Sequence, residues 1–365
     1  MTIFDFWKRD KLNKICKVKQ PMFKLLQSKN KKAFEIQFNW IFVLVAGAAI
    51  LIFFTVILVK QRNASELSSR AVVVKSIESI ITGASISKDT TNTIDIPNSE
   101  IEVSCNKFSL GGVSKQYQSL ILFAPGLING KSIVTQTTGF SAPYKATNLL
   151  YITSPNVRYI IIGNNEISRE INRSLPSSLK KEVYITAPAA FQNKKNYKAR
   201  FIIFDSTDLS SIDISAFDKM QDSDVTALKV AGDAETGTVE FYEKRKDSWG
   251  AAKGASAYIR KASLLGAVYS DTSDAYECSM KNAFLRLNLV NKVYIGRTVS
   301  LKSEAAFKGQ AECEDLYGKA LVQLNAIGAS SQGFTAAKTS DLSAAAKLLE
   351  GINKDAQFNS CPLVY

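Results

Sequence analysis

The stretch WIFVLVAGAAILIFFTVILV at Trp40–Val59 decides the first part of the fold, because its twenty residues carry no charge and only Thr55 has a polar side chain. A helix of this length spans about 30 Å, which matches the hydrocarbon core of a bilayer. Trp40 stands where an interfacial aromatic residue is expected, and Lys60 follows the other end. The sequence therefore predicts one transmembrane helix at 40–59, with a tail at 1–39 and a large domain beyond it.

The formal net charge of +13 comes mainly from the tail. Residues 1–39 hold ten Lys or Arg and three Asp or Glu, a net of +7, which leaves +6 over the other 326 residues. A charge spread so thinly does not indicate a nucleic-acid interface. The mixed apolar and basic residues of the tail suit a helix on an anionic membrane surface, or equally a solvated tail. We expect the lipid bilayer as a partner, and no nucleic acid.

The basic residues before the transmembrane segment predict that the tail is cytoplasmic, which would place the domain on the other side of the cell membrane. Cysteine usage points the same way, because Cys16 is alone in the tail whereas the domain contains an even number. In an oxidising space the four domain cysteines would form two disulfides, drawn from Cys105, Cys278, Cys313 and Cys361. Three connectivities fit them, and the alternative is four buried thiols in a cytosolic domain.

The helical pattern continues beyond the membrane segment. Apolar residues recur at helical spacing at Leu67, Ala71, Val74, Ile77 and Ile81. Gly83 is a suitable residue to end this helix. We therefore expect an amphipathic continuation at 60–84, whose apolar face needs a partner surface.

The next part of the domain, at 85–270, alternates between strand-like and helical patterns. Residues 85–98 are rich in turn-forming side chains, so we expect a polar turn there. Strand-like runs follow at 101–104, 119–123, 131–137, 148–152, 158–162, 183–186, 200–204, 225–230 and 238–242, and 165–175 is helical. This alternation predicts an α+β or α/β domain with a mixed sheet.

The last part of the chain, at 271–365, is predicted to be helical and to pack on the same domain. One long amphipathic helix begins after Ser273, and a second carries Cys313 on its apolar stripe, which suits a disulfide beneath that helix. Ser340 has the chemistry of an N-cap for a short third helix ending at Gly351.

The chain contains no histidine, which excludes catalytic triads, Cys-His nucleophiles and histidine zinc sites. The glycine-rich patterns GxGxxG and GxxxxGK[ST] are also absent from the sequence. We therefore expect no catalytic residue and no cofactor. A deep pocket lined by converging Asp or Glu side chains would instead favour an enzyme that uses carboxylates.

The most suggestive local motif is DSTDLSS at 205–211, directly after a predicted strand, where α/β folds tend to place ligands. It resembles the Asp-x-Ser-x-Ser metal site of von Willebrand type A domains, with Asp205 and Thr207 in register. Leu209 stands in place of the second serine, however, which leaves only Asp205 and Thr207 as candidate metal ligands. The alternative is that these side chains cap the next turn.

Two further kinds of modification site follow from short patterns. Asn63-Ala-Ser and Asn172-Arg-Ser match the N-glycosylation sequence, which matters only if the domain is extracytoplasmic. The lysines before Ala33 and Phe34 could mark a processing site between these two residues. Cleavage there would lower the net charge from +13 to +5.

Two stretches are similar to a group of uncharacterised single-pass membrane proteins from archaea. They are FEIQFNWIFVLVAGAAILIFF at 34–54, and GTVEFYEKRKDSW at 237–249 taken with DAYECSMKNAFLRLNLVNKVY at 274–294. The resemblance covers most of the chain and implies the membrane-anchored layout. It implies no activity.

Three functions follow as hypotheses. The first is an anchored surface protein without catalytic activity, which has a structural, adhesive or interaction role and contacts a protein, a glycan or a second copy of itself. The second is a type IV pilin-like filament subunit or pseudopilin, although Glu35 is not placed as in pilins. The third is a carboxylate-based enzyme acting on envelope glycans.

Overall fold

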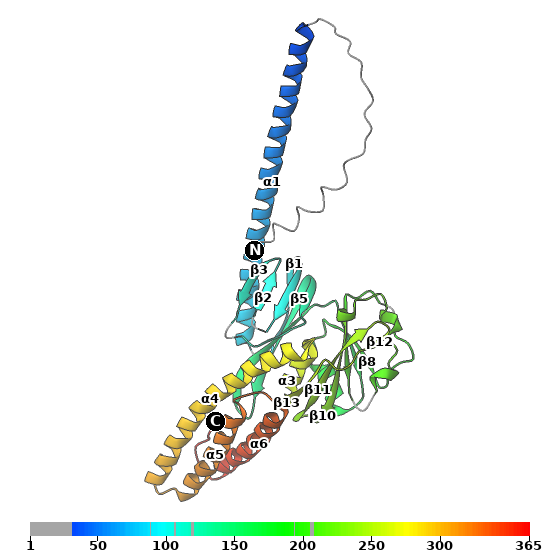
Figure 1. Cartoon of the computed structure of the whole chain (residues 1–365). Coiled ribbons are helices and arrows are strands. Elements are labelled where there is room, and N and C mark those ends of the chain that lie inside the picture. The colour runs from blue at the N-terminus through cyan, green and yellow to red at the C-terminus, as the bar shows by residue number, and fades with distance from the viewer. Residues whose placement is uncertain (1–30, 88, 106, 118–119, 193, 205–207) are drawn as a thin grey trace. The chain divides into compact units, whose positions relative to one another are not determined.

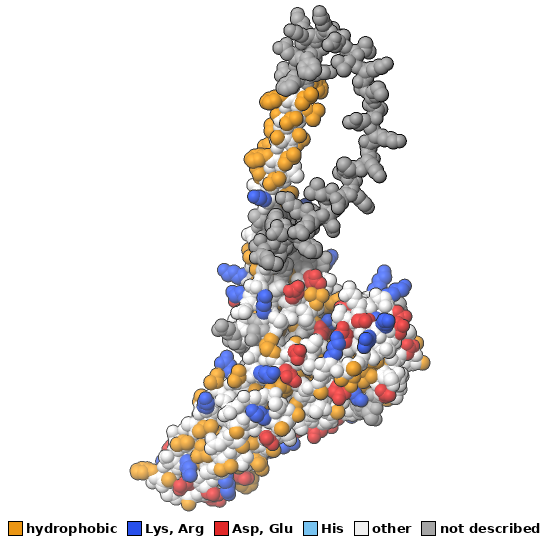
Figure 2. Space-filling model, in the orientation of Figure 1, with side chains coloured by type: hydrophobic (Ala, Val, Ile, Leu, Met, Phe, Trp, Pro, Cys, Tyr) orange, Lys and Arg blue, Asp and Glu red, His pale blue; other side chains and the backbone are white. Residues whose placement is uncertain are grey.

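The computed structural model describes residues 31–87, 89–105, 107–117, 120–192, 194–204 and 208–365. The chain divides into two units, Met1–Ala64 and Ser65–Tyr365. Helix α1 (Lys31–Ile86) includes the segment Trp40–Arg62, which has a mean hydropathy of 3.0 and none of its apolar window buried (Figures 1 and 2). Among the described residues it is the one helix long and apolar enough to cross a membrane.

The second half of α1 has a buried face, as its spacing predicts. Val74 and Ile77 are 4% and 2% exposed and pack in a cluster with apolar residues of the first sheet. Contrary to expectation, α1 continues through Gly83 to Ile86. A glycine inside a helix costs only about 1 kcal/mol, so Gly83 does not by itself end the helix.

Sheet A, the first of two sheets, has the strand order β3-β2-β1-β5-β6-β4. Its strands are β1 (Thr91–Ser104), β2 (Lys107–Leu110), β3 (Val113–Gln116), β4 (Leu122–Phe123), β5 (Leu127–Ser141) and β6 (Lys145–Thr153). Strand β1 overturns the expected turn at 85–98. Its first residues pair with β5, with a register shift between Asp95 and Ser99, so the partner strand supplies the order that the polar side chains do not indicate.

Sheet B has the order β12-β11-β10-β9-β7-β8, with β13 also paired to β11. Its strands are β7 (Val157–Ile162), β8 (Lys180–Tyr184), β9 (Lys198–Ile203), β10 (Val225–Gly232), β11 (Thr236–Arg245), β12 (Ser248–Trp249) and β13 (Gly254–Ile259). The four strands β8, β7, β9 and β10 are parallel, and β11 runs antiparallel to β10. Helix α2 (Glu166–Ser174) connects β7 to β8, as the sequence predicts, with Asn165 as its N-cap. The fold is therefore α+β with mixed sheets.

Each sheet packs against other parts of the chain on both faces. Successive side chains of a strand point to opposite faces, so neighbouring residues belong to different clusters. In β6, Leu149 and Tyr151 face the main core, whereas Leu150 and Ile152 face α1. In sheet B, the face that carries Ile160 is covered by the connections from β8 to β9 and from β9 to β10. They contribute Phe191 and Phe217 among other residues. These faces fix how the two sheets stand against the helices.

The last part of the chain contains α3 (Arg260–Tyr269), α4 (Ser273–Phe307), α5 (Ala311–Ser330) and α6 (Ala336–Phe358). Figure 1 shows α4, α5 and α6 packed against one another, and α4 also contacts strands of both sheets. Helix α3 was not expected, because its buried residues follow no single-faced pattern.

Three further helix boundaries differ from those expected. Helix α4 begins at Ser273 with Thr272 as its cap, one residue earlier than expected. Helix α6 begins at Ala336 with Thr335 as its cap, and it continues through both Ser340 and Gly351 to Phe358. Buried residues along α6, such as Leu342 and Leu349, fix its length through packing, which outweighs the propensities at Ser340 and Gly351.

Candidate functional site

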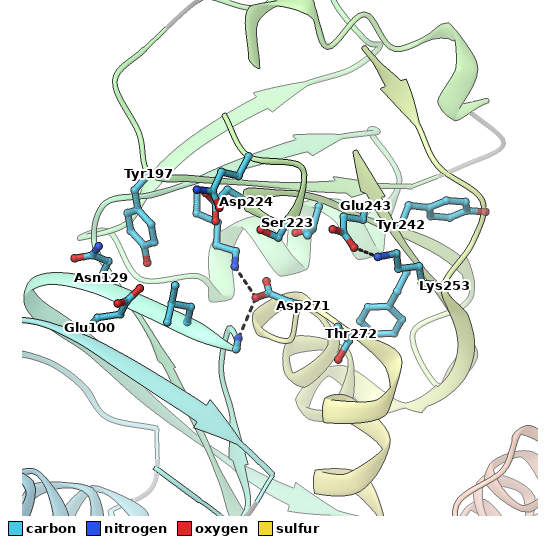
Figure 3. A pocket seen from close by; sticks show the side chains of 16 residues that line it. Glu100, Asn129, Tyr197, Ser223, Asp224, Tyr242, Glu243, Lys253, Asp271 and Thr272 are labelled. Atoms are coloured by element: carbon cyan, nitrogen blue, oxygen red, sulfur yellow. Dashed lines mark hydrogen bonds and ion pairs between the residues drawn. The ribbon is translucent and has the colours of Figure 1, made fainter. Parts of the chain in front are cut away.

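A cavity of about 420 Å³ lies where sheet A, sheet B and the junction of α3 with α4 meet (Figure 3). Its charged lining residues come from β1, from the start of β9, from the 3-10 turn before β10, from β11, from the residue before β13 and from that junction. They are Glu100, Lys198, Asp224, Glu243, Lys253 and Asp271. The cavity therefore meets the amino ends of the parallel strands β9 and β10, whereas the motif at 205–211 follows the carboxyl end of β9.

Asp271 makes the contacts that connect the walls of the cavity. Its Oδ2 accepts hydrogen bonds from Lys198 Nζ at 2.6 Å and from the backbone amide of Gly126 at 3.0 Å. Lys198 is 4% exposed, so this ion pair is shielded from bulk water. Figure 3 shows the Asp271 side chain pointing into the cavity, with Tyr197 pointing toward the same space. One carboxylate thus joins both sheets to the start of α4.

The position of Asp271 depends on Arg200, which follows two residues after Lys198 on β9. The Arg200 guanidinium donates hydrogen bonds to the carbonyl oxygens of Ala267, Val268 and Ser270 at the end of α3. A cation is stabilising there, since it meets the negative end of the helix dipole. Burial lowers the pKa of Arg200 to about 10, which leaves it charged at neutral pH. Arg200 therefore fixes the residues immediately before Asp271.

Asp224 closes a short 3-10 turn at 222–224 and lines the same cavity. Burial raises the pKa of Asp224 above its ordinary range, and nearby Asp271 adds to the effect while Lys198 opposes it. No described residue forms an ion pair with the Asp224 carboxylate. Asp224 is therefore a carboxylate held in the cavity without a partner cation.

The other two acids differ in their environment. Glu243 of β11 forms an ion pair with Lys253, whereas Glu100 of β1 has no ion pair with a described residue. Thr226 of β10 also lines the cavity, and its hydroxyl is buried without a hydrogen-bond partner among the described residues. The cavity thus contains two neutralised acids, two unpaired acids and two buried hydroxyls, those of Tyr197 and Thr226, that have no hydrogen-bond partner among the described residues.

The structure describes only part of the predicted metal motif. Asp205 and Thr207 lie outside the described residues. Asp208 caps the 3-10 turn Leu209–Ser211, as the alternative interpretation expects. Asp222 pairs with Lys244 at 3.1 Å. Over the described part of the chain, no group of three or more Asp, Glu or Cys is arranged to hold a metal ion.

The four domain cysteines form the pairs Cys105–Cys278 and Cys313–Cys361. The first pair joins the end of β1 to α4, and the second joins α5 to the C-terminal segment. Cys313 and Cys361 are 7% and 5% exposed, so this bond lies beneath α5. Cys16 lies outside the described residues.

The predicted modification sites lie on helices. Asn172 is half-buried in α2, where its carbonyl oxygen accepts a hydrogen bond from Lys181 at 3.0 Å. Asn63 lies within α1, and Ala33 and Phe34 lie in its first turn.

A second candidate site is the outer face of α4, which we define as Leu285, Leu289, Val293, Val299 and Phe307. These side chains are between 49% and 93% exposed. They share one side of the helix with Gly296, whose surroundings are open. Over α4, Figure 2 shows hydrophobic and basic side chains next to one another.

The basic residues on or beside this face are Lys281, Arg286, Lys292 and Arg297. No Asp or Glu occurs between Glu277 and Glu304. The outer face of α4 is therefore both apolar and positively charged.

Comparison with protein family models, curated proteins and solved structures finds no match for this chain. The resemblance to archaeal membrane proteins and to pilins therefore remains an expectation, and the site rests on its own geometry.

Sequence analysis did not identify Lys198 or Asp271, although both stand at element boundaries. Lys198 begins β9 after a polar loop, and Asp271 lies between two helices. A lysine that starts a strand whose residues are all buried was the available signal, because such a residue is rarely buried unless it is paired. Its partner is 73 residues away and could not be named without the fold.

Proposed function

We propose that the chain is a membrane-anchored, extracytoplasmic surface protein that acts by binding another protein and not by catalysis. The observation that carries this proposal is the outer face of α4. Monomeric proteins rarely leave a long row of large apolar side chains in water, and such rows mark interaction surfaces. From Leu285 to Phe307 the row extends about 33 Å along the helix.

The chemistry of the surface favours one kind of partner, an amphipathic helix with acidic flanks. Valine, leucine and an open glycine at Gly296 suit close packing against another helix. The cations on and beside this face would attract Asp and Glu on the partner. A second copy of the same surface would instead bring like charges together, and it is therefore disfavoured.

The anchor and the location have separate support. Trp40–Arg62 has the length and composition of a membrane span. The two disulfides suit an oxidising compartment, because cytosolic thiols are normally kept reduced. Together they favour a domain outside the cytoplasm with the basic tail inside.

The contact is tested by photocrosslinking in native membranes with a crosslinking amino acid at position 293. The matched control is Val322 of α5, another apolar residue that is 63% exposed. We expect an adduct from position 293 only, which joins an acidic amphipathic segment and is lost in the double variant R286E/R297E. Equal adducts from both positions, crosslinking to lipid, or crosslinking to a second copy would contradict the proposal.

The location is tested with a membrane-impermeant amine reagent on intact cells. Exposed lysines of the domain, such as Lys354, should react at once. Lysines of the tail, such as Lys8, should react only after the cells are permeabilised. The reverse order would place the domain in the cytoplasm.

A filament subunit is a second candidate, favoured by the way Val74 and Ile77 of α1 pack against sheet A. A helix with one half in the membrane and the other half on a sheet resembles the N-terminal helix of a type IV pilin. Intact mass spectrometry on protein from native membranes separates the two candidates. A mature N-terminus at Phe34 would support the filament subunit, whereas an intact Met1 would exclude it.

A carboxylate-based enzyme is a third candidate, favoured by the convergence of Glu100, Asp224, Glu243 and Asp271 on one cavity. Two of these acids already pair with lysines, which leaves Glu100 and Asp224 to act as an acid and a base. Release of sugars from envelope glycans by the wild type, and not by D224N, would favour this candidate over a binding protein.

A further inference from the structure

The cavity has an excess of negative charge, whereas the whole chain has an excess of positive charge. Four acids and two lysines line it, whereas the chain has a net charge of +13. Lys198 and Lys253 each engage one acid, so the excess negative charge belongs to Asp224 and Glu100. A partly buried carboxylate without a counter-charge is costly, and a bound cation would relieve that cost.

Thr226 supplies a second, independent observation that indicates a ligand. This residue is only 4% exposed and lines the cavity beside Asp224. Its Oγ1 has no hydrogen-bond partner within the described residues. Buried hydroxyl groups are nearly always paired, so an unpaired one at a cavity wall indicates that something else supplies the partner.

We propose that this cavity binds an organic cation that carries a primary ammonium group, either a free amine or a lysine side chain of another chain. The ammonium group has three N–H donors and no acceptor. It donates to the carboxylate of Asp224 and to the hydroxyl of Thr226, while Glu100 adds attraction from the rim. The volume of about 420 Å³ accommodates a short alkylamine or a lysine side chain.

The apolar part of the cavity fits the chain that carries such an ammonium group. Phe241 of β11 and Leu127 of β5 line it together with Tyr197. Aromatic rings attract cations through their faces and contact methylene groups through their area. The site therefore discriminates against anions. It does not depend on the outer face of α4 and goes beyond the proposed function.

The test is calorimetric titration of the full chain in detergent with four probes. Putrescine represents a free amine, and capped lysine amide represents a side chain. Capped norleucine amide has the same hydrocarbon chain without the charge, and acetate represents an anion. We expect at least one amine to bind with a Kd below about 1 mM, and neither the norleucine probe nor acetate to bind. Equal binding of lysine and norleucine amides, or no binding of either amine, would overturn the proposal.

The two amine probes distinguish the sources of the ligand. Preference for putrescine would assign the site to a free amine. Preference for the lysine amide would assign it to a lysine of a partner chain. Both results support the shared chemistry.

Three variants locate the binding. D224N should weaken amine binding at least tenfold, and E100Q should weaken it several-fold. The matched control is D218N, which removes an exposed acid in the same loop region but outside the cavity, and it should bind as the wild type does. Unchanged binding by D224N would contradict the assignment.

T226V provides a check that does not depend on charge. Replacing an unpaired buried hydroxyl with a methyl group should raise the melting temperature of the ligand-free protein. The same change should weaken amine binding, because the ammonium group loses an acceptor. A merely structural role for Thr226 would leave binding unchanged and would remove this support. Failure of the crosslinking test at α4 would not affect either result.

Discussion

Arg200 is the residue on which the geometry of the cavity depends most. Its side chain is buried and satisfies three carbonyl oxygens at the end of α3. In R200M the methionine fills a similar volume but donates nothing, so these carbonyls lose their partner. We expect a loss of about 3 kcal/mol in the free energy of unfolding. Urea denaturation measures this loss, and R245M, at an exposed position of β11, should change stability by less than about 0.5 kcal/mol.

Glu182 predicts a pH dependence at the opposite edge of sheet B. Burial alone would raise its pKa, but hydrogen bonds from Arg158, Lys194 and Tyr184 lower the pKa of Glu182 to about 2. The Arg158 contact is bidentate, at 3.0 Å and 2.7 Å. Since the ordinary pKa is 4.5, the unfolded chain binds this proton first as the pH falls. The stabilisation by Glu182 is therefore present above pH 4.5 and is lost as the pH falls toward 2.

The measurement is urea unfolding of the wild type and of E182Q across this pH range. The wild type should be the more stable at pH 6, and the difference should shrink steadily below pH 4.5. A difference that stays constant with pH would show that the ion pair does not account for the lowered pKa.

At the scale of elements, α6 offers a direct comparison between a real cap and an expected one. Thr335 Oγ1 accepts a hydrogen bond from the Lys338 amide at 3.3 Å, whereas Ser340 lies exposed inside the helix. T335A should therefore cost about 1 kcal/mol of stability. S340A should be neutral or slightly stabilising, because alanine is the better helix former. Thermal denaturation of the two variants measures both effects, and a larger loss in S340A would contradict the observed start of α6.

The same scale shows what local patterns predict well. The buried stripe of α5, from Cys313 to Ile327, follows its helical spacing, and α2 lies within its predicted bounds. Strand β9 is also close to its predicted range, because its run of apolar residues is buried on both faces. The end of strand β1 was predicted at 101–104, but its polar first half was missed, since that half is a strand only by pairing with β5.

At the scale of the whole molecule, the disulfides connect parts that are distant in sequence. Cys105 and Cys278 are 173 residues apart, whereas Cys313 and Cys361 are 48 apart. In the chain-entropy account, the longer loop constrains the unfolded chain more. We expect C105S/C278S to lose about 1 kcal/mol more stability than C313S/C361S. Chemical denaturation measures the difference, and non-reducing peptide mapping should recover these two pairs and no other.

The candidate site was beyond prediction for the same reason that the cysteine pairing was. The carboxylate of Asp271 meets Lys198 and Gly126 only after two sheets and two helices have packed. No local sequence pattern predicts these contacts, because the contacting residues are far apart in the chain.

The sequence by itself determined the apolar segment long enough to span a membrane, the helical faces of the last hundred residues and the alternation of strands and helices. These features depend on composition and periodicity within a few turns of chain, where each side chain has a fixed direction. Only the tertiary structure decided the course of β1, the length of α6, the disulfide pairs and the acidic cavity. Each of these depends on contacts between residues far apart in sequence, whose energies exist only once the core is packed.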